Sequence, residues 1–314
     1  MSVEQILNKR LLLVTGKGGT GKTTVAAAIG RLAAERGRKT IICEVDVQKS
    51  SIPPIFGVSP GYQPTSVAPR LSVCNLDWHN ALEEWLERTV PGQRVVRLIL
   101  NNPVVRVFLD ATPGAREVVI LSKIASLAET WDLVIIDMPA SGHAIGMLRV
   151  PRLAMRLMAG GPIRKRAEEL LTVFGRRDTG LVIVALPEEM VVNETIETFT
   201  AVRAEVPRLD MPLILLNRSA TPTLTTDERA LLERLSARAD LPPEARELLL
   251  AGRWEASLEE DTRDAMARLS AEIGLPVLPF PRLGTLGGYE GGADRVVTQM
   301  AAALARAELL ERSR

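Results

Sequence analysis

Residues 11–24 read Leu-Leu-Leu-Val-Thr-Gly-Lys-Gly-Gly-Thr-Gly-Lys-Thr-Thr, and this stretch decides the fold. The apolar run 11–15 predicts a buried strand, and the residues after it match the Gly-x-x-x-x-Gly-Lys-Thr spacing of a phosphate-binding loop. A helix is predicted at 25–34, which is the context that such a loop requires. Because strand, loop and helix are in register, a glycine-rich turn without a ligand is disfavoured. We therefore expect a nucleoside triphosphate as the ligand.

Each residue type in the loop has a physical role in holding phosphates. Backbone N–H groups surround the β-phosphate, Lys22 reaches the β- and γ-phosphate oxygens, and the Thr23 hydroxyl is a magnesium ligand. The glycines allow the phosphates to approach the backbone closely. The nucleotide-binding residues expected in the loop are Gly16, Lys17, Gly18, Gly19, Thr20, Gly21, Lys22, Thr23 and Thr24.

Further apolar segments alternate with helical stretches along the whole chain. They lie at 39–44, 71–75, 133–137, 181–186, 212–217 and 275–280. This alternation predicts an α/β fold with a doubly wound, mostly parallel sheet that carries helices on both faces. Ligands of such sheets bind at the carboxyl ends of the strands, where the phosphate-binding loop, Asp46, Asp137 and Asn217 all fall.

The length of the chain is expected to be taken up by one domain, residues 1–314, with helical excursions at about 79–130, 146–178 and 221–272. The formal net charge is only +1, so no overall basic field favours nucleic acid as a partner. The N-terminus runs directly into the first strand and does not resemble a signal peptide, and no apolar run approaches the about 18 residues of a membrane span. A cytoplasmic protein without a transmembrane segment is expected.

The two cysteines, Cys43 and Cys74, both lie in apolar segments that are predicted to be strands. They are expected to be buried thiols in a reducing compartment, and not a disulfide or a metal pair.

Two of the predicted strands end in carboxylates. Residues 135–143, Ile-Ile-Asp-Met-Pro-Ala-Ser-Gly-His, deliver Asp137 at the end of a buried strand, where it is placed to hold magnesium through a water molecule. Gly142 can supply an N–H that senses the γ-phosphate, as in a switch segment. His143 is either a catalytic base or, in the interpretation we favour, a hinge or packing residue. The second of these carboxylates is Glu44, at the end of the predicted strand 39–44. Glu44 either shares the magnesium shell or, more simply, forms a salt bridge.

Lys17 directly follows the first glycine of the loop, a point at which an ordinary phosphate-binding loop does not specify lysine. A loop of this form resembles the deviant phosphate-binding loop of the ATPases that include the ArsA arsenite-pump subunit, the Get-pathway targeting ATPase, MinD, ParA and the nitrogenase iron protein. The resemblance implies a P-loop ATPase of the SIMIBI type that uses ATP and Mg2+. It also implies a homodimer, or a pair with a related paralogue, in which Lys17 reaches the partner's nucleotide and acts like an arginine finger. A solvated loop lysine is the alternative.

Other segments are similar to the ArsA and Get-pathway branch of these ATPases. The segment from Asp137 to His143 resembles Asp-Thr-Ala-Pro-Thr-Gly-His of that branch, whereas MinD and ParA proteins typically lack the histidine. Asp46 falls on the aspartate of the branch's Ser-Thr-Asp-Pro-Ala-His segment, which implies that it orients the attacking water and contacts the magnesium shell. This chain departs from the pattern after Asp46, where it has Val-Gln-Lys-Ser.

The resemblance also predicts a pocket for the base. Asn217 ends a predicted strand where the family places a matching asparagine, and its amide can read an adenine edge. The alternative for Asn217 is an ordinary turn residue. Pro281 and Arg282, after the last predicted strand, are expected to form the other wall of the pocket.

The sequence also bears on the process that ATP hydrolysis drives. Arsenite transport is disfavoured because the ArsA family uses a trio of cysteines, and the Cys-x-x-Cys zinc clasp of the Get-pathway dimer is absent from the sequence. A methionine-rich stretch contains Met147, Met155 and Met158, and it forms either a groove for an apolar client helix or ordinary core or dimer interface.

We expect a dimeric, Mg-dependent ATPase that couples ATP binding and hydrolysis to capture or release of a partner, either a hydrophobic client or a membrane-associated protein. The alternatives are a MinD- or ParA-like positioning ATPase and a nucleotide-gated scaffold with little turnover.

Overall fold

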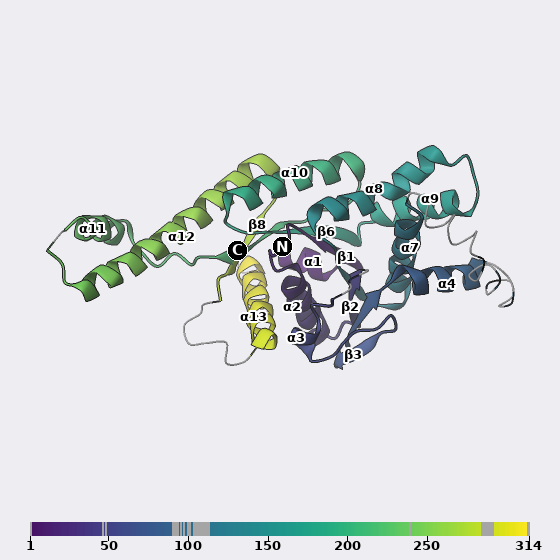
Figure 1. Cartoon of the computed structure of the whole chain (residues 1–314), viewed down its shortest axis with the longest axis horizontal. Coiled ribbons are helices and arrows are strands. Elements are labelled where there is room, and N and C mark those ends of the chain that lie inside the picture. The colour runs from purple at the N-terminus through teal and green to yellow at the C-terminus, as the bar shows by residue number, and fades with distance from the viewer. Residues whose placement is uncertain are drawn as a thin grey trace.

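The computed structural model describes residues 2–45, 47, 49–89, 94, 96, 98, 102, 114–238, 240–283 and 292–312. Its eight described strands form one sheet in the order β3-β4-β2-β5-β1-β6-β7-β8 (Figure 1). The inner strand β1 (Leu11–Thr15) pairs in parallel with β5 (Leu133–Asp137) on one side and with β6 (Thr179–Ala185) on the other. The strand that leads into the glycine-rich loop is therefore an inner strand, paired on both edges.

The other parallel strands lie outside these three. They are β2 (Thr40–Val45), β4 (Leu71–Leu76), β7 (Ile214–Ser219) and β8 (Val277–Pro281). The doubly wound, mostly parallel sheet predicted from the sequence is thus confirmed. The edge strand β3 (Thr65–Ala68) pairs antiparallel with β4 and was not predicted, because it is short, partly exposed and lacks an apolar run.

Side chains of β1 alternate between two cores, one on each face of the sheet. Leu11 and Leu13 point into one cluster of buried apolar residues, and Leu12 and Val14 point into the other. This alternation follows from the period of two residues in a strand. Because both faces are buried, every residue of β1 is apolar except the last, Thr15.

Helices cover each face. On one face α2 (Lys22–Glu35) packs against α13 (Gly292–Arg312), with α1 (Ser2–Leu7) and α3 (Pro53–Phe56) beside α13. The helices whose apolar residues join the core on the other face are α4 (Trp78–Thr89), α7 (Ala115–Thr130), α8 (Ser141–Leu157), α9 (Pro162–Phe174), α10 (Glu189–Glu205) and α12 (Pro243–Ile273). None of the described helices combines the length and the apolar character needed to cross a membrane.

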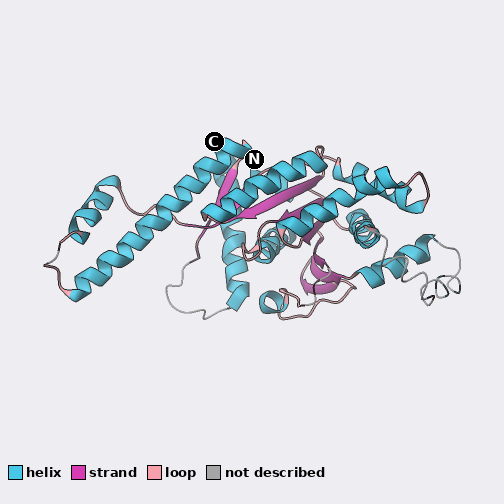
Figure 2. Cartoon of the chain, turned by 45° about the horizontal axis from the view of Figure 1, so that its top comes forward, coloured by secondary structure: helices cyan, strands magenta, loops and turns pink. Residues whose placement is uncertain are grey.

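The last helical excursion forms an arm. Helix α12 runs away from the sheet, and α11 (Thr226–Ser236) folds back along it (Figures 1 and 2). The buried residues of α12 all lie between Glu259 and Ile273, and the described side chains of α11 include none that is buried. Large apolar side chains on the outer part of α12 remain exposed, among them Leu248 at 74% and Trp254 at 64%.

Candidate functional site

Two glycines of the loop are fixed by close contacts. Gly16 has φ 147°, and a Cβ added there would lie 2.2 Å from the carbonyl oxygen of Val184 on β6. Gly21 has φ 90° and precedes α2, and a Cβ on it would lie 2.6 Å from Nδ2 of Asn217. Any larger residue at either position would push the loop off the neighbouring strands β6 and β7.

The other two loop glycines face open space. A Cβ on Gly18 or on Gly19 would meet no atom within 4 Å. The backbone between them is therefore accessible, which is the property that a loop needs if its N–H groups are to surround a phosphate. Thr20 closes this turn, because its hydroxyl donates a hydrogen bond to the carbonyl of Lys17 at 2.9 Å.

Lys22 lies within the loop with its ammonium group turned inward. Its Nζ donates to the carbonyl oxygen of Lys17 at 3.1 Å. Burial lowers the pKa of Lys22, and the carboxylates of Asp137 and Glu194 act in the opposite direction. A partly desolvated cation in a loop of accessible N–H groups suits an anionic ligand.

Thr23 and Asp137 meet at the end of β5. The Thr23 hydroxyl donates to Oδ2 of Asp137 at 2.5 Å. The other carboxylate oxygen, Oδ1, is buried and has no hydrogen-bond partner among the described atoms. Burial raises the pKa of Asp137 to about 6; the bond from Thr23 and the charge of Lys22 oppose this rise, and Glu44 adds to it.

This pair has the chemistry of a magnesium site. Mg2+ is a hard cation that takes oxygen ligands, often one carboxylate together with phosphate oxygens and water. A buried carboxylate oxygen without a partner, next to a hydroxyl, provides such ligands, so these residues fit the ion that the loop motif implies. The described residues contain no cluster of three or more His, Cys, Asp or Glu that would hold a metal by itself.

Lys17 is paired within its own chain. Its Nζ lies 3.4 Å from Oε2 of Glu194 on α10. The second oxygen of Glu194 accepts a hydrogen bond from the hydroxyl of Ser141, and the Ser141 N–H donates to the carbonyl of Gly16 at 3.1 Å. Neither Glu194 nor Ser141 was assigned a role in the sequence analysis.

The second acidic strand end is only partly described. Glu44 is buried and accepts hydrogen bonds from the Ser50 hydroxyl at 2.5 Å and the Ser51 N–H at 2.7 Å. Since the described contacts of Glu44 include no ion pair, the salt-bridge interpretation is not supported. Asp46 lies outside the described residues, so its role in orienting water stays a prediction.

The segment that contains Gly142, residues 135–143, is called the switch segment here, and its last three residues begin α8. Gly142 and His143 are exposed, and a Cβ on Gly142 would meet no atom within 4 Å. The exposure of His143 does not support a packing role. Thr24, also expected at the nucleotide, is partly buried in the first turn of α2.

The predicted base pocket lies at the ends of β7 and β8. Asn217 is buried; its Nδ2 donates to the carbonyl of Thr20 at 2.8 Å, and its Oδ1 accepts from the N–H of Arg218 at 2.9 Å. Pro281 pairs with Ser219, and the N–H of Arg282 donates to the Ser219 carbonyl at 2.7 Å. The structure therefore brings residues 217 and 281–282 together, while in this state the Asn217 amide holds the loop.

Arg218 is a residue that the sequence analysis missed. It has φ 55°, a left-handed conformation that is uncommon for a residue with a side chain, and its Nη2 lies 3.4 Å from the carbonyl oxygen of Gly19. No sequence signal marks it apart from its place after Asn217.

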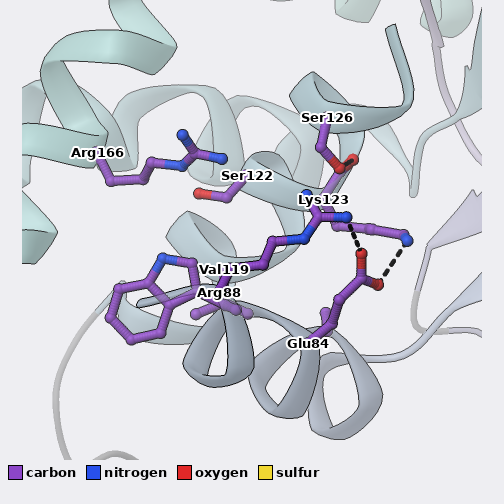
Figure 3. Close-up of a pocket in the computed structure, with 9 residues that line it drawn as sticks. Glu84, Arg88, Val119, Ser122, Lys123, Ser126 and Arg166 are labelled. Carbon is purple, nitrogen blue, oxygen red and sulfur yellow. Dashed lines mark hydrogen bonds and ion pairs between the residues drawn. The ribbon is translucent and has the colours of Figure 1, made fainter. Parts of the chain in front are cut away.

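A small pocket lies between α4, α7 and α9, and no loop residue lines it (Figure 3). Glu84 receives hydrogen bonds from Lys123 at 2.5 Å and Tyr62 at 2.7 Å, and it is paired with Arg88 at 2.5 Å. Partial burial acts to raise the pKa of Glu84, but these bonds from Lys123 and Tyr62 and the nearby positive charges lower it on balance. Burial raises the pKa of Tyr62, and the hydrogen bond to the Glu84 carboxylate adds to this rise.

Both cysteines and Met147 lie in the core. Cys43 and Cys74 are buried and free on neighbouring strands, with their Sγ atoms 3.3 Å apart. Burial raises the pKa of Cys43. Met147 is also buried, and Met155 and Met158 are partly buried, so the methionine-rich stretch packs largely into the core and the groove interpretation is not supported there.

The chain is similar to known proteins over most of its length. The family model described as "Anion-transporting ATPase" matches residues 9–177. "ATPase BagA" of Mycobacterium tuberculosis is 28% identical over 237 residues, which cover 70% of this chain and 68% of that protein. A "Putative arsenical pump-driving ATPase" of Halobacterium salinarum is 30% identical over 171 residues, 50% of this chain and 26% of that protein. An "ATPase ASNA1 homolog" of Entamoeba histolytica is 29% identical over 164 residues, 48% of this chain and 50% of that protein.

Proposed function

The chain belongs to the anion-transporting ATPase family and is an ATPase, and we propose that two copies of it close around ATP and Mg2+ to capture or release a partner protein. In this proposal residues 1–314 act as one P-loop ATPase domain. The observation that carries the proposal is the meeting of Thr23 and Asp137 beside Lys22, at the end of a loop whose backbone is open at Gly18 and Gly19.

The residues of the site are proposed to have the following roles in binding phosphates and metal. The N–H groups of the loop and the ammonium of Lys22 hold the phosphates, and Lys22 exchanges the Lys17 carbonyl for phosphate oxygens. Thr23 and Asp137 hold the metal, Asp137 through water. When bound there, Mg2+ would supply positive charge against the phosphates.

Other residues would complete the nucleotide site. Gly142 would offer its N–H to the γ-phosphate, and Asp46 would orient the attacking water and contact the metal shell. Asn217, Pro281 and Arg282 would enclose the base, because the ends of β7 and β8 bring them together.

The dimer is supported by the position of Lys17. Its side chain is 37% exposed, and its only described ion pair is with Glu194, whose side chain is 33% exposed. A lysine at the open face of the loop can leave this partner at little cost. It would then place positive charge on the γ-phosphate of a facing protomer, where low dielectric strengthens its effect on the transition state.

The partner is proposed to be a hydrophobic client or a membrane-associated protein. Several relatives, among them the Halobacterium salinarum protein, bear names that refer to an arsenical pump, but Cys43 and Cys74 of this chain are buried among strands, which does not favour a metalloid ligand role. A positioning ATPase and a scaffold with little turnover remain the alternative functions. Sedimentation with liposomes and with DNA in the presence of ATP distinguishes the first, and the turnover rate distinguishes the second.

The test of the proposal is the mass in solution together with hydrolysis. Light scattering with a non-hydrolysable ATP analogue and Mg2+ is expected to give twice the protomer mass, and a chelator is expected to return the protomer. A protomer that keeps its mass under saturating analogue, with Lys17 turned to solvent, would overturn the dimer.

A further inference from the structure

One carboxylate connects three separate parts of the site. Glu194 on α10 pairs with Nζ of Lys17 through Oε2 at 3.4 Å, and its Oε1 accepts a hydrogen bond from the Ser141 hydroxyl at the start of α8. The Ser141 N–H in turn donates to the carbonyl of Gly16 at 3.1 Å. Gly16 is therefore held by Ser141 and Lys17 by Glu194, and these two partners, which lie on neighbouring helices, are hydrogen-bonded to each other.

The ammonium group of Lys17 cannot serve two sites at once. In the described state it extends toward α10 within its own chain, whereas a function in a facing protomer requires that it extend away from this chain. We propose that Glu194 is a latch, which holds Lys17 in its own protomer until ATP-dependent assembly withdraws it. This inference rests on the proposed dimer and makes Glu194 a positioning residue for Lys17.

Ser141 makes the latch sensitive to the switch segment. The hydroxyl of Ser141 occupies one oxygen of the carboxylate, so the other oxygen is directed to Lys17. Ser141 immediately precedes Gly142, the residue proposed to contact the γ-phosphate. A shift of this segment toward the phosphate moves the donor that orients Glu194 and thereby weakens its hold on Lys17.

The size of the effect follows from the exposure of the pair. The side chains of Lys17 and Glu194 are 37% and 33% exposed, and ion pairs with this exposure change an equilibrium by about two- to fivefold. A symmetric dimer opens two latches, so the two factors multiply. Removal of the latch is expected to lower the dissociation constant of the ATP-bound dimer by about four- to twenty-fivefold. The latch therefore weakens dimerisation and does not prevent it.

The variant for the test is Glu194→Gln. The amide keeps the shape of the side chain and an oxygen that accepts from Ser141, but it removes the charge that holds Lys17. Glu197→Gln is the matched control, since Glu197 is exposed on the same helix one turn later. The affinity of the protomer for a fluorescent nucleotide is measured in parallel, because Glu194 also acts on the pKa of Lys22.

The first measurement needs no dimer. The nucleotide-free proteins are treated with an amine-acylating reagent, and the modification rate of Lys17 is compared by peptide mass spectrometry with that of the exposed Lys165. We expect Glu194→Gln to raise the relative rate of Lys17 about two- to fivefold and Glu197→Gln to leave it unchanged. Equal rates in all three proteins would overturn the latch.

The second measurement is the dimer dissociation constant with a non-hydrolysable ATP analogue, corrected for nucleotide occupancy. A constant lowered about four- to twenty-fivefold in Glu194→Gln supports the proposal. If wild type dimerises and Glu194→Gln does so equally well, the latch is wrong and the proposed dimer stands. If no protein dimerises, the proposed function is overturned, and the latch with it.

Discussion

The hydroxyl of Thr23 donates to Oδ2 of Asp137 at 2.5 Å, although the two residues are 114 positions apart in the chain. Parallel pairing of β1 with β5 explains the contact, because Val14 lies opposite Asp137 and the loop continues directly from β1. The same pairing leaves Oδ1 of Asp137 buried without a partner among the described atoms. A buried carboxylate oxygen without a partner costs stability, and a cation bound there would remove that cost.

Asp137→Asn is expected to stabilise the nucleotide-free protein and to abolish Mg-dependent nucleotide binding. A carboxyl group whose pKa is raised from 3.8 to about 6 contributes stability that is present below pH 3.8 and lost as the pH rises through about 6. Above pH 6 the buried charge therefore costs about 3 kcal/mol, which the neutral amide avoids. Urea unfolding at pH 4 and pH 8 measures this, with a difference between variant and wild type expected only at pH 8.

Lys22→Ala is expected to weaken ATP binding by at least about 100-fold, because charge-assisted hydrogen bonds to two phosphates are lost. Burial already lowers the pKa of Lys22, so the fold does not depend on its charge. Calorimetric titration with the analogue checks the affinity. Wild-type affinity in a correctly folded variant would remove Lys22 from the site.

Lys17→Ala is expected to keep nucleotide affinity within about threefold of wild type, since Lys17 faces away from its own phosphates in the proposal. Hydrolysis is expected to fall by about 1,000-fold, the lower range for loss of an arginine finger, together with ATP-induced dimerisation. Normal turnover by this variant would contradict action across the dimer. Phosphate release and light scattering on the same samples provide the two readouts.

Gly16→Ala is expected to destabilise the protein by about 3 kcal/mol or more, because its methyl group would lie 2.2 Å from the Val184 carbonyl and the residue has φ 147°. Gly18→Ala is the matched control, since a methyl group there meets no atom within 4 Å. We expect the control to change stability by less than about 1 kcal/mol and to weaken nucleotide binding. Thermal unfolding of both variants without nucleotide distinguishes the two effects.

Glu84→Gln is expected to lower the free energy of unfolding at pH 7 by about 1 kcal/mol, because Lys123 and Arg88 lose their shared partner (Figure 3). The lowered pKa of Glu84 contributes stability above its ordinary value of 4.5 that is lost as the pH falls below it, so the difference disappears in acid. The exposed Glu87→Gln serves as the control in urea unfolding at pH 7 and pH 3. An equal loss at both pH values would show that packing and not charge is responsible.

The sequence predicted the parts of the fold that local pattern determines. The buried parallel strands are continuous apolar runs, so seven of the eight described strands lie where such runs were found. The edge strand β3 has no such run, because its pairing with β4 depends on backbone hydrogen bonds and not on a buried face.

Contacts between distant segments could not be predicted in the same way. The loop motif predicted Thr23 at the magnesium site, and the end of an apolar strand predicted Asp137 there. The pairing of Lys17 with Glu194 depends instead on how α10 lies across the start of α8. Likewise, the methionine spacing fits a surface groove and a core face equally well, and only the packing of α8 shows that Met147 is buried.

The arm of α11 and α12 has a consequence for how this protein can change over time. Because its buried residues begin only at Glu259, the outer hairpin contributes little to the packing of the sheet. Insertions, deletions and new side chains there leave the nucleotide machinery intact. A lineage can thus vary this hairpin while it keeps the same ATPase site.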